Sequence, residues 1–187
     1  MVGIIGNGFV GNAVYQNLRD RVKCKVYDVD QNRSFNTLEE VLSQDFIFVC
    51  LPTPMRKDGS CDLSILEKFF QDIEDMDLDC LQERTFIIKS TVPIGTTKRL
   101  AEKHSLTWIV HNPEFLTARN AVHDFKVAQR TVIGGDSLLT SRVAQLYYGY
   151  IYFAQDHNII QCSSDESEAI KYFSNTFLAY KLSLIHI

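Results

Sequence analysis

The stretch Val2-Gly3-Ile4-Ile5-Gly6-Asn7-Gly8-Phe9-Val10-Gly11 decides the fold expected for this chain. Val2–Ile5 is a short apolar run typical of a buried β-strand, and the amphipathic run Val10–Leu18 is typical of a helix. Between and at the edge of the two runs, three glycines follow the spacing Gly-x-Gly-x-x-Gly. In a strand–turn–helix context this spacing predicts a loop that holds a pyrophosphate against the N–H groups of the helix start.

An acidic residue follows at the place where a dinucleotide site needs one. Lys23–Tyr27 is predicted to be the second strand, and Asp28 comes directly after it. A carboxylate there accepts hydrogen bonds from ribose hydroxyls and repels a 2′-phosphate, so NAD is favoured over NADP. The basic Arg33 lies where it can cover the adenine or reach a phosphate, so NADP is not excluded. The cofactor residues expected from this region are Gly6, Gly8, Phe9, Val10, Gly11, Asp28 and Arg33.

Short apolar runs alternate with amphipathic segments along most of the chain. Further strands are predicted at Phe46–Leu51, Thr85–Lys89, Thr107–Val110 and Arg130–Ile133, and further helices at Leu38–Leu42, Leu63–Ile73, Thr96–Lys103, Glu114–Val122 and Leu138–Tyr147. Thr37 followed by Glu40 fits a capping box at the start of one helix. This alternation predicts an α/β fold, a Rossmann-like, doubly wound and mainly parallel sheet, followed by a long C-terminal helix.

The last segment differs from the rest because no strand follows it. From residue 164 the pattern is helical, with Ala169, Phe173, Phe177 and Tyr180 near one face. It runs to Ile187 without a terminal glycine or polar stop. We therefore expect an NAD-binding domain over residues 1–163 and, over 164–187, the start of a connecting helix whose second domain is absent from this sequence.

Composition narrows the class of partner. The net charge of −4 gives no basic excess for nucleic acid or an anionic membrane, and no stretch approaches the roughly 20 apolar residues of a membrane span. The histidines show no ligand spacing, so no metal site is expected. The cysteines are odd in number and scattered, which predicts free thiols in a cytoplasmic protein; they are Cys24, Cys50, Cys61, Cys80 and Cys162.

Four further segments carry a family resemblance. They are Leu51-Pro52-Thr53-Pro54, Ser90-Thr91-Val92-Pro93-Ile94-Gly95-Thr96, Asn112-Pro113-Glu114-Phe115-Leu116, and Glu168-Ala169-Ile170-Lys171 with Asn175. In this order, together with the glycine loop, they resemble the nucleotide-sugar 6-dehydrogenase family, typified by UDP-glucose and GDP-mannose 6-dehydrogenases. The resemblance covers residues 1 to about 181. It implies NAD-dependent oxidation of the C6 alcohol of a nucleotide sugar, through an aldehyde and a cysteine-bound thioester, to the acid.

The same resemblance implies roles for individual residues. Thr53 and Thr91 match threonines at the cofactor and the active site. Glu114, Phe115 and Leu116 match a segment lining the sugar-nucleotide pocket, with the glutamate as acid/base group. Lys171 and Asn175 match the lysine and asparagine that hold the sugar and the developing oxyanion. The chemistry of these two residue types agrees with the implied role. Residues four apart share a face of a helix, and an ammonium and an amide N–H both stabilise negative charge on an oxygen.

Structural roles stay open for several of these residues. Lys171 could instead be a solvated surface lysine. Glu114 could be an acid in the first turn of a helix, where acids are favoured, and Thr91 could be a turn residue at the end of a strand. For His111, next to Asn112, a structural role is expected. The nucleotide and the sugar remain undetermined by the sequence.

Two departures from the family pattern limit the expected activity. Ala118 stands where the family has a second glutamate, and none of the cysteines lies in the context of the family nucleophile. Turnover by this chain alone is therefore expected to be incomplete. A non-catalytic module that binds NAD or a nucleotide sugar is the alternative, and a dehydrogenase of the hydroxyacid type is a third, disfavoured by Pro-Glu-Phe-Leu. The family dimerises through the helix that begins near residue 164, which implies a homodimer as one assembly.

Overall fold

A computed structural model describes residues 1–76, 83–106, 108–152 and 157–185. Seven strands form one sheet in the order β2-β1-β3-β4-β5-β6-β7. Neighbours from β2 to β5 are parallel, β5 and β6 are antiparallel through the pair His111 and Gly134, and β6 and β7 are parallel. The strands are β1 (Val2–Ile5), β2 (Cys24–Tyr27), β3 (Phe46–Val49), β4 (Thr85–Ile88), β5 (Ile109–His111), β6 (Arg130–Gly134) and β7 (Asn158–Cys162).

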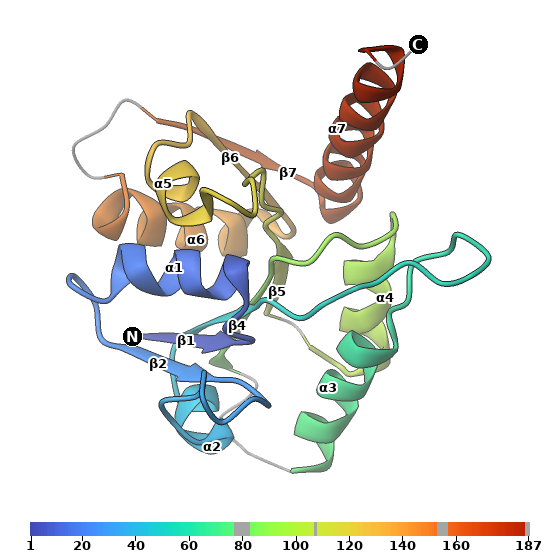
Figure 1. The fold of residues 1–187 in the computed structure, drawn as a ribbon. Coiled ribbons are helices and arrows are strands. Elements are labelled where there is room, and N and C mark those ends of the chain that lie inside the picture. Colours follow the sequence, from blue (N-terminus) through green and yellow to red (C-terminus); the bar gives the residue numbers. More distant parts are fainter. Residues whose placement is uncertain (77–82, 107, 153–156, 186–187) are drawn as a thin grey trace.

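Helices cover both faces of this sheet (Figure 1). One face packs against α1 (Phe9–Leu18), α5 (Ala121–Lys126) and α6 (Ser137–Tyr150). The other packs against α2 (Leu38–Leu42), α3 (Ser64–Asp75) and α4 (Thr96–Lys103). The predicted Rossmann-like, doubly wound and mainly parallel sheet is therefore confirmed, as is the long C-terminal helix, α7 (Ser164–Ile185).

The central strands β1, β3, β4 and β5 are buried on both faces of the sheet, toward which their successive side chains point in turn. Ile4 of β1 and Phe48 of β3 belong to the cluster under α1 and α6, whereas Ile5 and Val49 belong to the cluster under α2 and α3. This explains why these strands read as continuous apolar runs rather than as alternating ones. Because β1 to β5 run parallel to one another, their carboxyl ends meet at one edge of the sheet, and the loops that follow these strands gather there.

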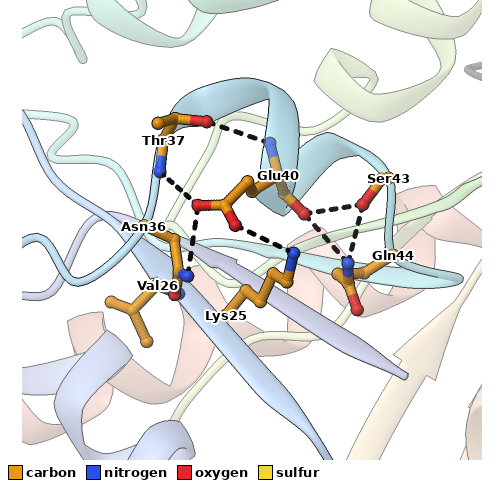
Figure 2. A network of polar contacts seen from close by, with 7 residues as sticks. All are labelled: Lys25, Val26, Asn36, Thr37, Glu40, Ser43 and Gln44. Carbon is orange, nitrogen blue, oxygen red and sulfur yellow. Dashed lines mark hydrogen bonds and ion pairs between the residues drawn. The ribbon is translucent and has the colours of Figure 1, made fainter.

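The predicted capping box at α2 is confirmed (Figure 2). The Glu40 N–H donates to Thr37 Oγ1 at 3.3 Å, and the Thr37 N–H donates to a carboxylate oxygen of Glu40 at 3.0 Å. The same carboxylate accepts from Lys25 Nζ at 3.2 Å, and Asn36 Oδ1 accepts from the Val26 N–H at 3.1 Å. The start of α2 is thereby tied to β2, the strand that leads to Asp28.

The predicted helix Glu114–Val122 is wrong for all but its last two residues. Residues 114–120 form a loop, and α5 begins only at Ala121. The carboxylate of Asp124 accepts from the Thr117 N–H at 2.8 Å and from its hydroxyl at 2.6 Å, and Glu114 accepts from the Leu116 N–H at 2.5 Å. Such side-chain contacts satisfy backbone groups outside a helix, and so they compete with helix formation.

Other predicted boundaries are close to those observed, and one strand was not predicted. β5 comprises Ile109–His111 rather than 107–110, and Thr107 lies outside the described residues. β7 was not predicted because its sequence lacks a long apolar run. It is a largely exposed edge strand with only two adjacent apolar residues, Ile159 and Ile160. It pairs with β6 and thereby leads the chain into α7.

The first turns of α7 lie against the sheet edge, and the rest of the helix projects from the body of the molecule (Figure 1). Ser167, Glu168 and Lys171 are buried, whereas Phe173 and Phe177 are 74% and 65% exposed. Residues 186 and 187 of the predicted segment lie outside the described chain. No helix among the residues that the structure describes has the length and apolar character needed to cross a bilayer.

Candidate active site

The glycine loop joins β1 to α1 at the carboxyl edge of the sheet. Gly6 has a φ of +86°, and a Cβ there would lie 2.6 Å from the carbonyl oxygen of Cys50. A Cβ on Gly11 would lie 1.9 Å from the carbonyl oxygen of Gly6, so α1 packs directly against the loop. Gly8 precedes the first residue of α1, and no side chain of the described residues caps this helix. The N–H groups of its first turn are thus available to an anion.

Asp28 lies beside this loop at the end of β2. Its carboxylate accepts from the Asn7 N–H at 2.5 Å and from the Asp30 N–H at 2.9 Å. The Asn7 side-chain amide donates to the carbonyl oxygen of Arg33 at 2.8 Å, and the Arg33 guanidinium pairs with Asp30 at 3.4 Å. The segment 28–33 is therefore held against the glycine loop. Each carboxylate oxygen of Asp28 keeps a lone pair for a further donor, such as a ribose hydroxyl.

A cavity of about 570 Å³ runs from Asp28 to the ends of β3 and β4. The Thr53 hydroxyl donates to the carbonyl oxygen of Thr91 at 2.7 Å, which joins the loops after these two strands. Gly11 alone among the predicted cofactor residues does not line the cavity, because it is buried beneath the loop. The predicted cofactor residues that line it are Gly6, Gly8, Phe9, Val10, Asp28, Arg33, Thr53 and Thr91. An uncapped helix start and a carboxylate at the end of β2, on one elongated cavity, fit a dinucleotide.

Lys171 of α7 meets Glu114 in the loop after β5. Its Nζ lies 3.2 Å from Glu114 Oε1 and also donates to the carbonyl oxygen of Glu114. The two side chains are only 5% and 13% exposed. The alternative of a solvated surface lysine is therefore wrong, and so is the alternative that Glu114 lies in the first turn of a helix, since α5 starts at Ala121.

Of the remaining predicted substrate residues, Phe115 and Leu116 lie near this pair, whereas Asn175 does not contact it. The Phe115 ring lies between two cations, with Lys171 Nζ 5.1 Å and the Arg130 guanidinium 5.5 Å from its centre. Leu116 lines a second cavity of about 340 Å³, which Glu114 also lines. Asn175 lies one turn beyond Lys171 on α7 and is exposed, and its side chain makes no hydrogen bond to any residue that the structure describes. Lys171 and Glu114 thus meet directly, whereas the Asn175 side chain stays apart from them.

A buried lysine was not assigned a role from the sequence. Lys89 follows β4, is 3% exposed, and donates from Nζ to Asn112 Oδ1 at 3.1 Å. The Tyr147 hydroxyl donates to the same oxygen at 2.5 Å, and the Asn112 amide donates to the carbonyl oxygen of Val132 at 2.6 Å. Burial lowers the pKa of Lys89 to about 8. The signal available in the sequence was a lysine directly after the apolar run 85–88.

Two buried polar residues of α7 attach the helix to the sheet edge. The Glu168 carboxylate accepts from the Gly95 N–H at 2.6 Å, from the Thr97 N–H at 2.8 Å and from the Thr97 hydroxyl at 2.6 Å. It therefore caps α4 from another element, and burial raises its pKa. The Ser167 hydroxyl lies 2.9 Å from Nδ1 of His111. Burial lowers the pKa of His111 to about 3, which keeps the ring neutral, and its Nε2 lies 3.3 Å from the carbonyl oxygen of Ser90. These contacts agree with the structural role expected for His111.

The described cysteines carry free thiols. Cys80 lies outside the described residues, and the others, Cys24, Cys50, Cys61 and Cys162, are unpaired. Cys50 lines the elongated cavity. Burial raises the pKa of this thiol to about 12, so it is not a thiolate at neutral pH.

Comparisons with known proteins agree with this geometry. The sequence profile described as "UDP-glucose/GDP-mannose dehydrogenase family, NAD binding domain" matches residues 16–151. The chain is 27% identical, over 98% of its length, to the UDP-glucose 6-dehydrogenase of Campylobacter jejuni, of which it spans 53%. It is also 27% identical, over 99% of its length, to UDP-glucose 6-dehydrogenase TuaD of Bacillus subtilis, of which it spans 47%.

A solved structure of a UDP-glucose dehydrogenase also resembles this chain. The UDP-glucose dehydrogenase of the hyperthermophilic archaeon Pyrobaculum islandicum matches 98% of this chain with a TM-score of 0.78 and 28% identity, and the match covers 50% of that protein. The chain thus spans about half the length of these relatives. With its glycine loop, Asp28 and the profile match in agreement, the chain belongs to the UDP-glucose/GDP-mannose dehydrogenase family and corresponds to its NAD-binding domain.

Proposed function

We propose that this chain supplies the NAD-binding and acid/base half of a nucleotide-sugar 6-dehydrogenase, which oxidises the C6 alcohol of a UDP- or GDP-linked hexose. The buried pair of Glu114 and Lys171 carries the proposal, because Glu114 lines both the cofactor cavity and the adjoining cavity. In this proposal residues 1–163 form the NAD-binding domain and residues 164–187 begin the helix that leads to a second domain.

The chemistry of the pair suits an alcohol oxidation. When bound, NAD supplies the hydride acceptor. The alcohol proton must leave as the hydride does, and the Glu114 carboxylate accepts it directly or through a water. Lys171, whose ammonium has donors beyond those that bind Glu114, stabilises negative charge on the C6 oxygen. Asn175, exposed one turn along the same helix, adds an amide donor once a substrate is bound. Thr91, which lines the cofactor cavity, offers its hydroxyl from that side.

The second oxidation lacks a suitable nucleophile among the described residues. Cys50 lines the cofactor cavity, but its raised pKa keeps it protonated. In addition, the loop position at which the family has a second glutamate holds the exposed Ala118. We therefore propose that the described residues support aldehyde formation and not the thioester step.

The decisive experiment measures binding and oxidation with the purified chain and its Lys171→Met variant. NAD is mixed with UDP-glucose, GDP-mannose or UDP-N-acetylmannosamine, NADH is followed by absorbance, and aldehyde is trapped with a hydrazine. Because Lys171 stabilises the developing oxyanion, the variant should form NADH on the order of 100-fold more slowly. It should also bind the sugar nucleotide at least about tenfold more weakly, with unchanged affinity for NAD.

Lys181→Met provides a matched control, because Lys181 lies on the same helix and is exposed. It should behave as the wild type does. Full sugar-nucleotide affinity in the Lys171 variant would remove the role given to this lysine. Sustained formation of the acid would contradict the limit to a single oxidation.

A separate prediction concerns the role of Asp28 in the choice between NAD and NADP. Asp28→Ala should weaken NAD binding about 10- to 100-fold, because a charged acceptor for the ribose hydroxyls is lost. NADP affinity should fall less, because repulsion of the 2′-phosphate is lost as well. Calorimetric titration with both cofactors measures the two effects. Asp72→Ala, which removes an exposed carboxylate from α3 outside the cavity lining, should leave NAD affinity within about twofold. Equal losses for NAD and NADP would argue against the assignment.

A non-catalytic binding module is the second candidate, and Ala118 favours it. Tight binding of NAD and of a sugar nucleotide without any NADH or aldehyde would support this alternative. Homodimerisation through α7 also belongs to the proposal, supported by the exposed Phe173 and Phe177. Sedimentation equilibrium of the purified chain tests it.

A further inference from the structure

Lys89 stands at the boundary between the two cavities. It follows β4 at the carboxyl edge of the sheet and lines both the cofactor cavity and the smaller cavity next to it. Thr91, two residues further along, also lines the cofactor cavity. In the sheet β4 is separated from β2 by β1 and β3, so Lys89 and Thr91 lie away from the end of the cavity at Asp28. In a dinucleotide site the acid after β2 binds the adenosine half, so the nicotinamide half belongs at the Lys89 end.

The charge of Lys89 has no matching carboxylate. Its hydrogen-bond acceptor is the neutral amide of Asn112, which it shares with the Tyr147 hydroxyl. None of the ion pairs within the described part of the chain includes Lys89, whereas Glu114 is already paired with Lys171 at 3.2 Å. Lys89 is thus a buried cation held in place by neutral groups.

The surroundings do not cancel this charge. The titratable groups near Lys89 are Cys50 after β3, His111 on β5, Glu114 in the next loop, Tyr147 on α6 and Lys171 on α7, while Asp124, Arg130 and Tyr152 also line the second cavity. Burial keeps Cys50, His111 and Tyr147 neutral at pH 7. Glu114 and Lys171 offset each other, as do the single charges of Asp124 and Arg130. Lys89 therefore remains as the unmatched positive charge.

We propose that the Lys89 ammonium, held by Asn112 at the nicotinamide end of the cavity, sets the oxidation-state preference of the cofactor site, favouring NADH over NAD. The inference rests on the proposed function only in its placement of the nicotinamide half. The ring of NAD is a cationic pyridinium and the ring of NADH is neutral, so a fixed cation nearby weakens binding of the oxidised form alone. For an alcohol oxidation this preference assists hydride acceptance.

The expected size follows from Coulomb repulsion between two unit charges. At the effective dielectric constant of about 20 that suits such sites, like charges separated by several ångströms change an affinity by roughly tenfold or more. Because the second charge is that of a lysine with a pKa near 8, the effect must depend on pH. As the pH rises through this value, Lys89 loses its proton, and the affinity for NAD should increase while that for NADH stays constant.

The test compares dissociation constants for NAD and NADH, measured by calorimetry and by NADH fluorescence from about pH 7 to about pH 9. In the wild type, the ratio of the NAD to the NADH dissociation constant should fall about tenfold over this range. In Lys89→Met the ratio should already be low at about pH 7 and should not change with pH. Methionine is unbranched and one atom shorter than lysine, so it fills most of the same space, and Asn112 Oδ1 keeps the Tyr147 hydroxyl as a donor; the variant is therefore expected to fold.

Lys98→Met is the matched control, since it removes an exposed lysine from α4. It should leave both the ratio and its pH dependence unchanged. An identical ratio in wild type and Lys89→Met, or a wild-type ratio that does not vary with pH, would overturn the inference while leaving NAD binding intact. If the variant does not fold, the wild-type pH series still decides. Failure of both NAD and NADH to bind would instead overturn the cofactor site itself, and this inference with it.

Discussion

Replacing Gly11 with alanine is expected to destabilise the fold by roughly 3 kcal/mol and to abolish NAD binding. The added Cβ would lie 1.9 Å from the carbonyl oxygen of Gly6 and 3.3 Å from a methyl group of Ile4. Gly6 has little room to move, because the carbonyl oxygen of Cys50 lies so close that a Cβ on Gly6 would be only 2.6 Å from it. The first turn of α1 must therefore shift, and its N–H groups lose their direction toward the anion site. Urea unfolding and calorimetric titration with NAD measure the two losses.

Gly8→Ala separates the requirement of the fold from that of the cofactor. Apart from Gly8 and its two chain neighbours, none of the residues that the structure describes has an atom within 4 Å of a Cβ built at Gly8, so the free energy of unfolding should change by less than about 1 kcal/mol. The methyl group would nevertheless enter the cavity where the pyrophosphate approaches the backbone, so NAD affinity should fall about tenfold or more. A folded Gly11→Ala protein with wild-type NAD affinity would contradict this account of the loop.

Removing the Glu168 carboxylate is expected to be the second large effect. Glu168→Ala should lower the free energy of unfolding by about 3 kcal/mol, because two N–H groups at the start of α4 and the Thr97 hydroxyl lose their acceptor in a buried site. The loop from Ser90 to Gly95 precedes α4 and carries Thr91. Loosening it should therefore weaken NAD binding severalfold as well. Denaturant unfolding and cofactor titration are again the measurements.

Two further variants define the origin of the Glu168 effect. Asp165→Ala removes an exposed carboxylate from the first turn of the same helix and should cost less than about 1 kcal/mol. Glu168→Gln keeps the side-chain volume but turns an NH₂ group toward N–H donors, so its cost should approach that of the alanine variant. A cost for Glu168→Ala no larger than that for Asp165→Ala would show that the cap of α4 contributes little.

Predictions from the sequence succeeded where the determining contacts are local. The strand Val2–Ile5 and the helices Leu38–Leu42 and Thr96–Lys103 agree residue for residue with the structure. Each depends on a short pattern of apolar residues, and α2 also depends on a capping box that spans four residues. The helix predicted after Pro113 failed at residues 114–120, where the side chains of Glu114 and Asp124 accept from the N–H groups of Leu116 and Thr117 in a loop instead.

For the candidate site, the sequence alone determined the cofactor side. Gly6, Gly8 and Asp28 are recognisable because strand, loop and helix follow one another along the chain, and nearby residues suffice to make the turn. The pairing of Lys171 with Glu114, the cap that Glu168 places on α4 and the burial of Lys89 were decided only by the tertiary structure. Each joins or buries residues from separate elements of the chain, 57 residues apart in the first case and more than 70 in the second. Burial and charge pairing across such separations depend on the packing of the whole sheet edge, which no local pattern encodes.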